Sequence, residues 1–140
     1  MKEVIFNTVT EWEPESIIRL YKSAGWWADE YDPGEIPHLI RSSYRFVVGY
    51  FKGERDTVAM GRILSDNIAT AIIQDMCVLD AYRNQGIGEK LLSYLVNITK
   101  EAGNFSIYLV AEPDTSGFYV KSGFIPYKNK IFIRNIIRTT

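Results

Sequence analysis

The segment from residue 68 to residue 110 constrains the fold of this chain more than any other. A strand-like stretch runs from Ile68 to about Val78 and leads into a loop that contains glycines. Apolar residues then recur at helical spacing from Gly86 to Ala102, and a second short strand follows at residues 106–110. A strand–helix–strand crossover of this length makes the two strands parallel. The sequence therefore predicts a mixed α/β protein.

The flanking patterns add helices and antiparallel strands. Helices are expected from Pro14 to Gly25 and from Ile36 to Ser43, followed by a hairpin of strands at 46–51 and 58–64. That hairpin continues antiparallel into the strand at 68–78. After the crossover we expect a short helix at 115–122 with Asp114 as its N-cap, and a second hairpin over 124–127 and 131–136. Without repeats or linkers, residues 1–140 are expected to form one domain.

Composition excludes several classes of function. Lys and Arg total 16 and Asp and Glu total 17, a net charge of -1 that argues against binding to nucleic acid or anionic membranes. Cys77 is the only cysteine and His38 the only histidine, so we expect neither a disulfide nor a metal site built from several thiolates or imidazoles. No signal peptide or membrane-spanning stretch is recognisable, which favours a reduced, cytoplasmic protein.

The loop that opens the long helix has the features of a phosphate site. Helix N-termini present unpaired backbone N–H groups, and Gly86 and Gly88 leave the backbone accessible. Arg83 adds a positive charge beside them. The dinucleotide fingerprint is absent because Leu91 occupies its third glycine position, and no P-loop sequence occurs.

Two motifs resemble those of the GCN5-related N-acetyltransferases (GNAT). The run Arg83-Asn84-Gln85-Gly86-Ile87-Gly88 is similar to the family signature [QR]-x-x-G-x-[GA], whose loop binds the pyrophosphate of acetyl-CoA. The run Phe118-Tyr119-Val120-Lys121-Ser122-Gly123-Phe124 resembles the family's F-Y-x-K-x-G-F. The resemblance covers residues 46–124 and implies a GNAT fold, with a mixed, mostly antiparallel sheet of six to seven strands and about four helices.

The resemblance also implies roles in acetyl transfer from a thioester to an amine, without a covalent intermediate. Tyr119 would lie near the CoA sulfur and protonate the leaving thiolate, unless it is a core tyrosine. Asp75 would act as the base, directly or through water; a carboxylate that attracts a cationic substrate or a purely structural acid remains an alternative. The backbone of Met76, Cys77 and Val78 would pair with the pantetheine arm of acetyl-CoA.

The acceptor site would lie after the first helix. In the family the connection between the first two helices lines the acceptor pocket, so Trp26, Trp27 and Tyr31 could form a wall for a cationic or aromatic amine. The alternative is one core and one surface tryptophan. The leading interpretation is an N-acetyltransferase for a small primary amine. A protein acetyltransferase and a non-catalytic CoA-binding sensor remain open, as does a homodimer paired through residues 131–137.

Overall fold

The computed structural model describes residues 2–103 and 106–136 of the chain. It consists of two compact units, Met1–Val110 and Ala111–Thr140, and each is described by itself. The first unit holds the sheet and most of the helices, and the second holds one short helix and an extended segment. No helix in the described part of the chain has the length and apolarity that crossing a membrane requires.

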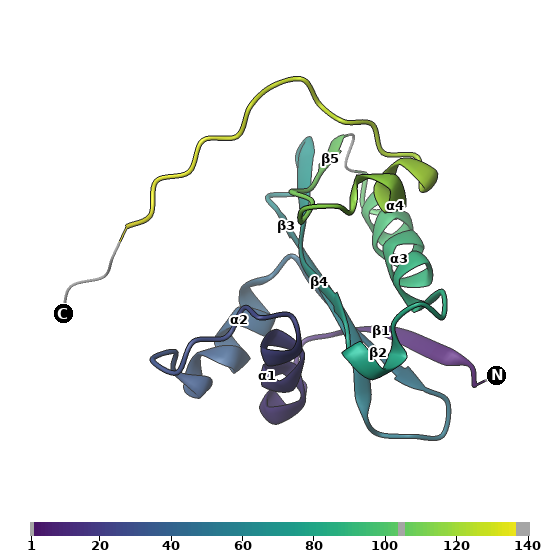
Figure 1. Cartoon of the computed structure of the whole chain (residues 1–140). Helices are drawn as coiled ribbons and strands as arrows, with labels where there is room; N and C mark the ends of the chain where they lie inside the picture. The colour runs from purple at the N-terminus through teal and green to yellow at the C-terminus, as the bar shows by residue number, and fades with distance from the viewer. Residues whose placement is uncertain (1, 104–105, 137–140) are drawn as a thin grey trace. The chain divides into compact units, whose positions relative to one another are not determined.

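The first unit is built on a five-stranded sheet (Figure 1). The strand order is β1-β2-β3-β4-β5, with antiparallel pairs up to β4 and a parallel pair between β4 and β5. The elements are β1 (Val4–Val9), α1 (Pro14–Ser23), α2 (Ile36–Ser42), β2 (Arg45–Phe51), β3 (Thr57–Ser65), β4 (Thr70–Val78), α3 (Ile87–Glu101) and β5 (Ser106–Tyr108). Short 3-10 turns lie at Pro33–Glu35 and Asp80–Tyr82.

Helices cover the sheet on both faces (Figure 1). On one face, α1 and α2 enclose a cluster of buried side chains that includes Leu20, Ile40 and Met60. On the other face α3 lies close to β3, because Gly61 leaves room for Leu95: a Cβ added to Gly61 would lie 2.8 Å from Leu95 Cδ1. Adjacent residues Met60 and Gly61 thus contact helices on opposite faces, as strand geometry requires.

Most of the expected elements of the first unit are confirmed. The hairpin of β2 and β3, its continuation into β4, the crossover helix α3 and the parallel strand β5 all form. The sequence analysis overlooked β1, which pairs with β2 from Val4 opposite Phe51 to Val9 opposite Phe46. Two residues of this edge strand, Asn7 and Thr8, are polar and exposed, so the apolar pattern that identifies a strand is interrupted.

The second unit differs from the sequence prediction in two respects, the N-cap of its helix and the absence of a hairpin among its described residues. The short helix α4 (Ser116–Lys121) forms, but its N-cap is Thr115, and Asp114 has a left-handed backbone with φ of 65°. The hairpin expected over 124–136 is wrong, because these described residues form no strand. Apart from the half-buried Phe124, their large apolar side chains are exposed, reaching 91% for Phe132, and Ile137 lies outside the described residues. The described sheet therefore has five strands instead of six to seven.

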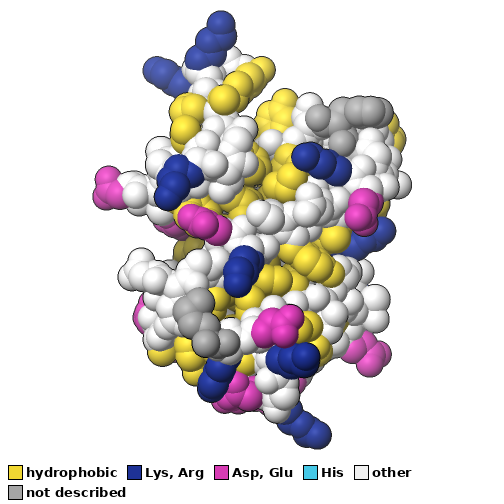
Figure 2. Space-filling view, turned by 90° about the vertical axis from the view of Figure 1, so that its right-hand side faces the viewer, with side chains coloured by type: hydrophobic (Ala, Val, Ile, Leu, Met, Phe, Trp, Pro, Cys, Tyr) yellow, Lys and Arg dark blue, Asp and Glu magenta, His cyan; other side chains and the backbone are white. Residues whose placement is uncertain are grey.

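Basic, acidic and apolar side chains are mixed on the surface shown in Figure 2. This arrangement is typical of a chain whose 16 basic and 17 acidic residues nearly balance.

Candidate functional site

A bulge in β4 shapes the centre of the candidate site. Met60 pairs with Cys77 and Arg62 pairs with Gln74, so two steps along β3 match three steps along β4. The extra residue reverses the alternation of side chains, and Asp75 in the bulge has φ of 56°. A left-handed backbone is unusual for a residue other than glycine, although aspartate tolerates it better than most. The bulge turns the Asp75 side chain toward α1.

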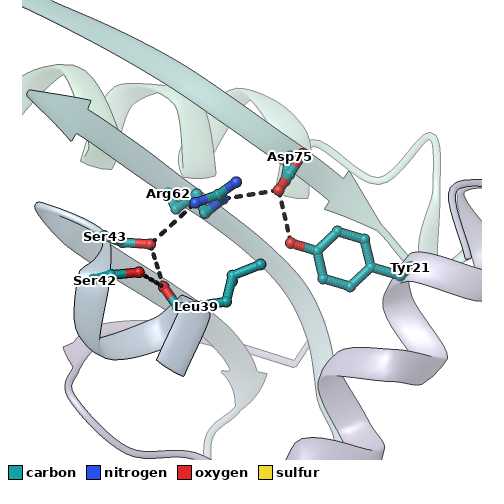
Figure 3. A network of polar contacts seen from close by, with 6 residues as sticks. All are labelled: Tyr21, Leu39, Ser42, Ser43, Arg62 and Asp75. Atoms are coloured by element: carbon teal, nitrogen blue, oxygen red, sulfur yellow. Dashed lines mark hydrogen bonds and ion pairs between the residues drawn. The ribbon is translucent and has the colours of Figure 1, made fainter. Parts of the chain in front are cut away.

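Asp75 is held by side chains from two other elements (Figure 3). Tyr21 Oη of α1 donates a hydrogen bond to Asp75 Oδ2 at 2.7 Å, and Arg62 Nε of β3 donates to the same oxygen at 2.8 Å. The Arg62 and Asp75 side chains are 16% and 19% exposed, so this ion pair is largely shielded from water. The sequence predicted Asp75 but gave no sign of its two partners.

The network continues to the end of α2 (Figure 3). Arg62 Nη1 lies 3.4 Å from Ser43 Oγ, which donates to the carbonyl oxygen of Leu39 at 2.7 Å. Burial and the neighbouring Asp75 carboxylate raise the pKa of Tyr21 above its usual value, so its phenol stays protonated and remains a donor. The network therefore ties α1, α2 and β3 to the bulge.

The predicted aromatic residues lie beside this network. The rings of Trp26 and Trp27 are each centred 6.4 Å from the Tyr21 ring, and Tyr31 meets Trp27 edge-on at 5.5 Å. Both tryptophans are partly buried against the α1–α2 core, whereas Tyr31 is 52% exposed. Tyr21 thus links the aromatic cluster to Asp75.

The loop between β4 and α3 leaves the start of the helix open. Gly86 has a left-handed backbone with φ of 83°, no side chain caps α3, and a Cβ at Gly86 would meet nothing within 4 Å. Asn84 also has a positive φ of 63°. These features suit the predicted phosphate site, because no side chain caps the first turn of this 15-residue helix and Gly86 places no side chain in front of it. Gln85, Ile87 and Gly88 complete this turn at the start of the helix.

Arg83 is positioned by contacts within this loop. Its Nε donates to the carbonyl oxygen of Val78 at 3.0 Å, and its Nη1 pairs with Asp80 Oδ1 at 2.7 Å. The side chain is about half exposed, so the guanidinium remains accessible to a ligand. A pocket of about 330 Å³ opens beside the loop, between Arg19 and Ser23 of α1, Asp56 and residues 79–82.

Residues 76–78 follow the bulge directly. Met76 and Val78 are partly buried, and Cys77 is 6% exposed. The Cys77 Sγ faces the carbonyl oxygen of Leu20 at 3.5 Å. Burial raises the pKa of the Cys77 thiol to about 11, so the thiol is neutral at physiological pH. These properties are those of an unreactive core cysteine.

In the second unit, Tyr119 of α4 is surrounded by aromatic rings. Phe118 meets it edge-on at 5.0 Å and Phe124 at 6.1 Å. Burial, with a smaller contribution from Glu112, raises the pKa of Tyr119 above its usual value. The phenol therefore keeps its proton at physiological pH.

Known proteins resemble this chain in sequence and in fold. The family model "Acetyltransferase (GNAT) domain" matches residues 42–126. Protein YyaT of Bacillus subtilis (strain 168) is 29% identical over 97 residues, which are 69% of this chain and 62% of that protein. Glucosamine 6-phosphate N-acetyltransferase 1 of Oryza sativa subsp. japonica is 32% identical over 53 residues, 38% of this chain and 32% of that protein. The chain thus matches less than two thirds of the length of either relative.

A solved structure has the same fold. The crystal structure of an acetyltransferase assigned to the GNAT family, from Xanthomonas campestris pv. campestris, superimposes with a TM-score of 0.78 at 23% sequence identity. The superposition covers 97% of this chain and 95% of the other. The family match extends over more than half of the 140 residues and includes both motifs at 83–88 and 118–124. The chain therefore belongs to the GNAT family of acetyltransferases.

Proposed function

We propose that this protein is an acetyl-CoA-dependent N-acetyltransferase that acts on a small primary amine. Two neighbouring features carry the proposal. The first is helix α3, whose N-cap is Gly86 and whose first turn has no side-chain cap. The second is the bulge of the preceding strand β4, which presents the Asp75 carboxylate. The first feature suits the pyrophosphate of acetyl-CoA, and the second suits an amine. We also propose that the protein works in the cytoplasm.

Residues 83–88 would hold the pyrophosphate of acetyl-CoA. The backbone N–H groups at the start of α3 would donate to the phosphate oxygens, and Arg83 would add a guanidinium. The backbone of Met76, Cys77 and Val78 would pair with the pantetheine arm, and an N–H there would polarise the acetyl carbonyl. The neutral Cys77 thiol takes no part in the chemistry.

The proposed reaction is a direct attack of the amine on the thioester. The nitrogen lone pair forms the new N–C bond, the C–S bond breaks, and the CoA thiolate takes a proton from Tyr119. Asp75 accepts the proton that the nitrogen loses, directly or through a water molecule. The raised pKa of Tyr119 supports its assignment as the acid, because the phenol is protonated before the thiolate forms.

The aromatic cluster would form the acceptor wall. Trp27 and Tyr31 meet edge-on next to Tyr21, and Tyr31 is exposed enough to contact a ligand. Exposed acidic residues at Asp29, Glu30 and Asp32 lie in the same connection and would attract cationic amines. Because one relative is named for glucosamine 6-phosphate, amino sugars are candidate acceptors beside aromatic amines.

A panel of acceptors tests the proposal. Release of free CoA thiol would be measured with acetyl-CoA and each of 2-phenylethylamine, spermidine, glucosamine 6-phosphate, a lysine-containing peptide and a peptide with a free N-terminus. We expect turnover with at least one small amine. Turnover with the peptides alone would favour a protein acetyltransferase. Heat protection by acetyl-CoA without any thiol release would overturn the enzyme proposal in favour of a CoA-binding sensor.

The exposed apolar segment keeps the homodimer proposal open. Ile131, Phe132, Ile133 and Ile136 are 69–91% exposed and would be covered if two copies paired through them. Sedimentation at micromolar concentration would distinguish a dimer from a monomer.

A further inference from the structure

The Asp75 network points to a role for Arg62 in selecting the ionisation state of the acceptor. We propose that Arg62 is a positioning residue that neutralises the acceptor subsite at Asp75, so that the subsite binds the free amine without stabilising the ammonium ion. This inference rests on the proposed function, because it assumes that the acceptor nitrogen meets Asp75. It gives Arg62 a place in the mechanism and explains why a positive charge stands beside Asp75.

The hydrogen-bond pattern leaves one carboxylate oxygen for a ligand. Both Tyr21 Oη and Arg62 Nε donate to Asp75 Oδ2, at 2.7 and 2.8 Å. Among the described residues, none donates a hydrogen bond to Oδ1. Two fixed donors on one oxygen hold the carboxylate in a single orientation, and Oδ1 remains as an acceptor for an N–H group of the substrate.

The charges around Asp75 sum to zero. Arg62 balances Asp75 directly, and the phenol of Tyr21 and the thiol of Cys77 are neutral at physiological pH. In the loop that follows β4, Asp80 and Arg83 form an ion pair of their own at 2.7 Å. An acceptor nitrogen at Oδ1 would therefore meet a hydrogen-bond acceptor whose own contacts carry no net charge, whereas Asp29, Glu30 and Asp32 lie in the exposed connection between α1 and α2.

Neutrality has a chemical benefit for acetyl transfer. An ammonium ion has no lone pair, so an acceptor that binds as the ammonium must lose a proton before it can attack the thioester. An unpaired, shielded carboxylate would bind the ammonium tightly and oppose that loss. A carboxylate already paired with a guanidinium still accepts a hydrogen bond from the neutral amine, but it attracts the cation much less.

Substitutions at Arg62 and Asp75 can set the charge of the subsite to each of three values. The charge is 0 in the wild type, -1 in Arg62→Gln, +1 in Asp75→Asn and 0 again in the double variant. Arg62→Lys keeps the charge and serves as the matched control, while Ser43→Ala removes only the 3.4 Å contact of Arg62 with α2. Circular dichroism and thermal melting would establish that each variant is folded.

The experiment measures kcat and KM at pH 7 for the amine of the panel that is acetylated fastest, and inhibition by its N,N,N-trimethyl derivative. In Arg62→Gln we expect KM to fall about fivefold and inhibition by the trimethyl cation to tighten similarly, while kcat falls about tenfold. Arg62→Lys and the double variant should bind the trimethyl cation as the wild type does, and Asp75→Asn more weakly. A purely structural role of Arg62 would not lower KM.

The outcomes separate the two proposals. If a small amine is acetylated but Arg62→Gln leaves KM unchanged or raises it, the role of Arg62 is overturned while the enzymatic function stands. If Arg62→Gln does not fold, the order of trimethyl-cation affinity among Arg62→Lys, the double variant and Asp75→Asn decides, and equal affinity in all three overturns the inference. If no amine is acetylated, the proposed function fails and this inference fails with it.

Discussion

The sheet unit and the C-terminal segment contain similar apolar residues, but these are buried in a strand in the first and exposed without regular structure in the second. Both contain runs of apolar β-branched and aromatic residues, such as Phe46-Val47-Val48 and Ile131-Phe132-Ile133. The first run is buried inside β2, with 0–1% exposure, between two antiparallel neighbours. The second is 69–91% exposed and has no regular structure. A strand-like composition becomes a strand only where a partner supplies the backbone hydrogen bonds.

The comparison predicts where the stability of the protein resides. All the side chains of the buried core belong to residues 17–99, and none of the described residues 111–136 is buried. The proposed functional residues divide differently, because Asp75 and the proposed phosphate loop belong to the sheet unit whereas Tyr119 belongs to the second. Variants in the two units should therefore affect stability very unequally and activity about equally.

The largest effect is expected from truncating the α3 core. Leu95 is fully buried and packs against the bare backbone of Gly61. Leu95→Ala should lower the free energy of unfolding by about 3 kcal/mol, because it leaves a cavity between α3 and β3. Urea denaturation followed by circular dichroism would measure this loss. A change below about 1 kcal/mol would show that α3 is not part of the main core.

A smaller effect, on activity alone, is expected from the phenol of α4. Tyr119→Phe should reduce kcat about a hundredfold and leave the affinity for acetyl-CoA unchanged, because only the proton for the thiolate is lost. Steady-state kinetics and calorimetric titration of acetyl-CoA would separate the two quantities. Tyr127→Phe, at an exposed position of the same unit, is the control and should retain wild-type turnover. Unchanged turnover in Tyr119→Phe would remove this residue from the mechanism.

Two glycines with the same backbone conformation allow a matched test of the phosphate loop. Gly86 and Gly25 have φ of 83° and 78°, and a Cβ at either would meet nothing within 4 Å. Substitution by alanine should lower the free energy of unfolding by about 1 kcal/mol at both positions, because alanine is strained in the left-handed region. Only Gly86→Ala should weaken acetyl-CoA binding in a calorimetric titration. Equal binding by both variants would place the pyrophosphate elsewhere.

The smallest effect is expected in the extended segment. Ile133→Ala should change the free energy of unfolding by less than about 0.5 kcal/mol, since Ile133 is 84% exposed. The same urea titration used for Leu95→Ala would measure it, at two protein concentrations. A loss of 2 kcal/mol or more that grows with protein concentration would reveal that the segment is buried between two copies.

Patterns local in the sequence were sufficient to predict much of the fold and part of the site. The helical spacing of α3 and the turn signals between β2, β3 and β4 depend on neighbouring residues, so the sequence alone predicts these elements. The glycine loop was predicted for the same reason. The left-handed backbone of Gly86 depends only on its own lack of a side chain and on the helix that it precedes.

The remaining features depend on contacts between distant residues. Tyr21 and Arg62 lie 54 and 13 residues from Asp75 along the chain, and no spacing rule connects them. Their contact depends on the bulge, which only the paired strand reveals. The absent hairpin over 124–136 illustrates the converse, because composition indicated strands there and could not indicate whether a partner was available.

The bulge in β4 decides which side chains of this strand face α1. Without the extra residue, Gln74 and Cys77 would still lie opposite Arg62 and Met60, and the one residue left between them would lie opposite Gly61 and point toward α3, away from Tyr21. Deleting Met76 would therefore turn Asp75 away from Tyr21 and Arg62, although all three residues would still be present. The length of β4 is therefore under a stricter constraint than its composition. Under the proposed function, substitutions in α1 and α2 could change the acceptor, while β4 must keep its number of residues for Asp75 to reach Tyr21 and Arg62.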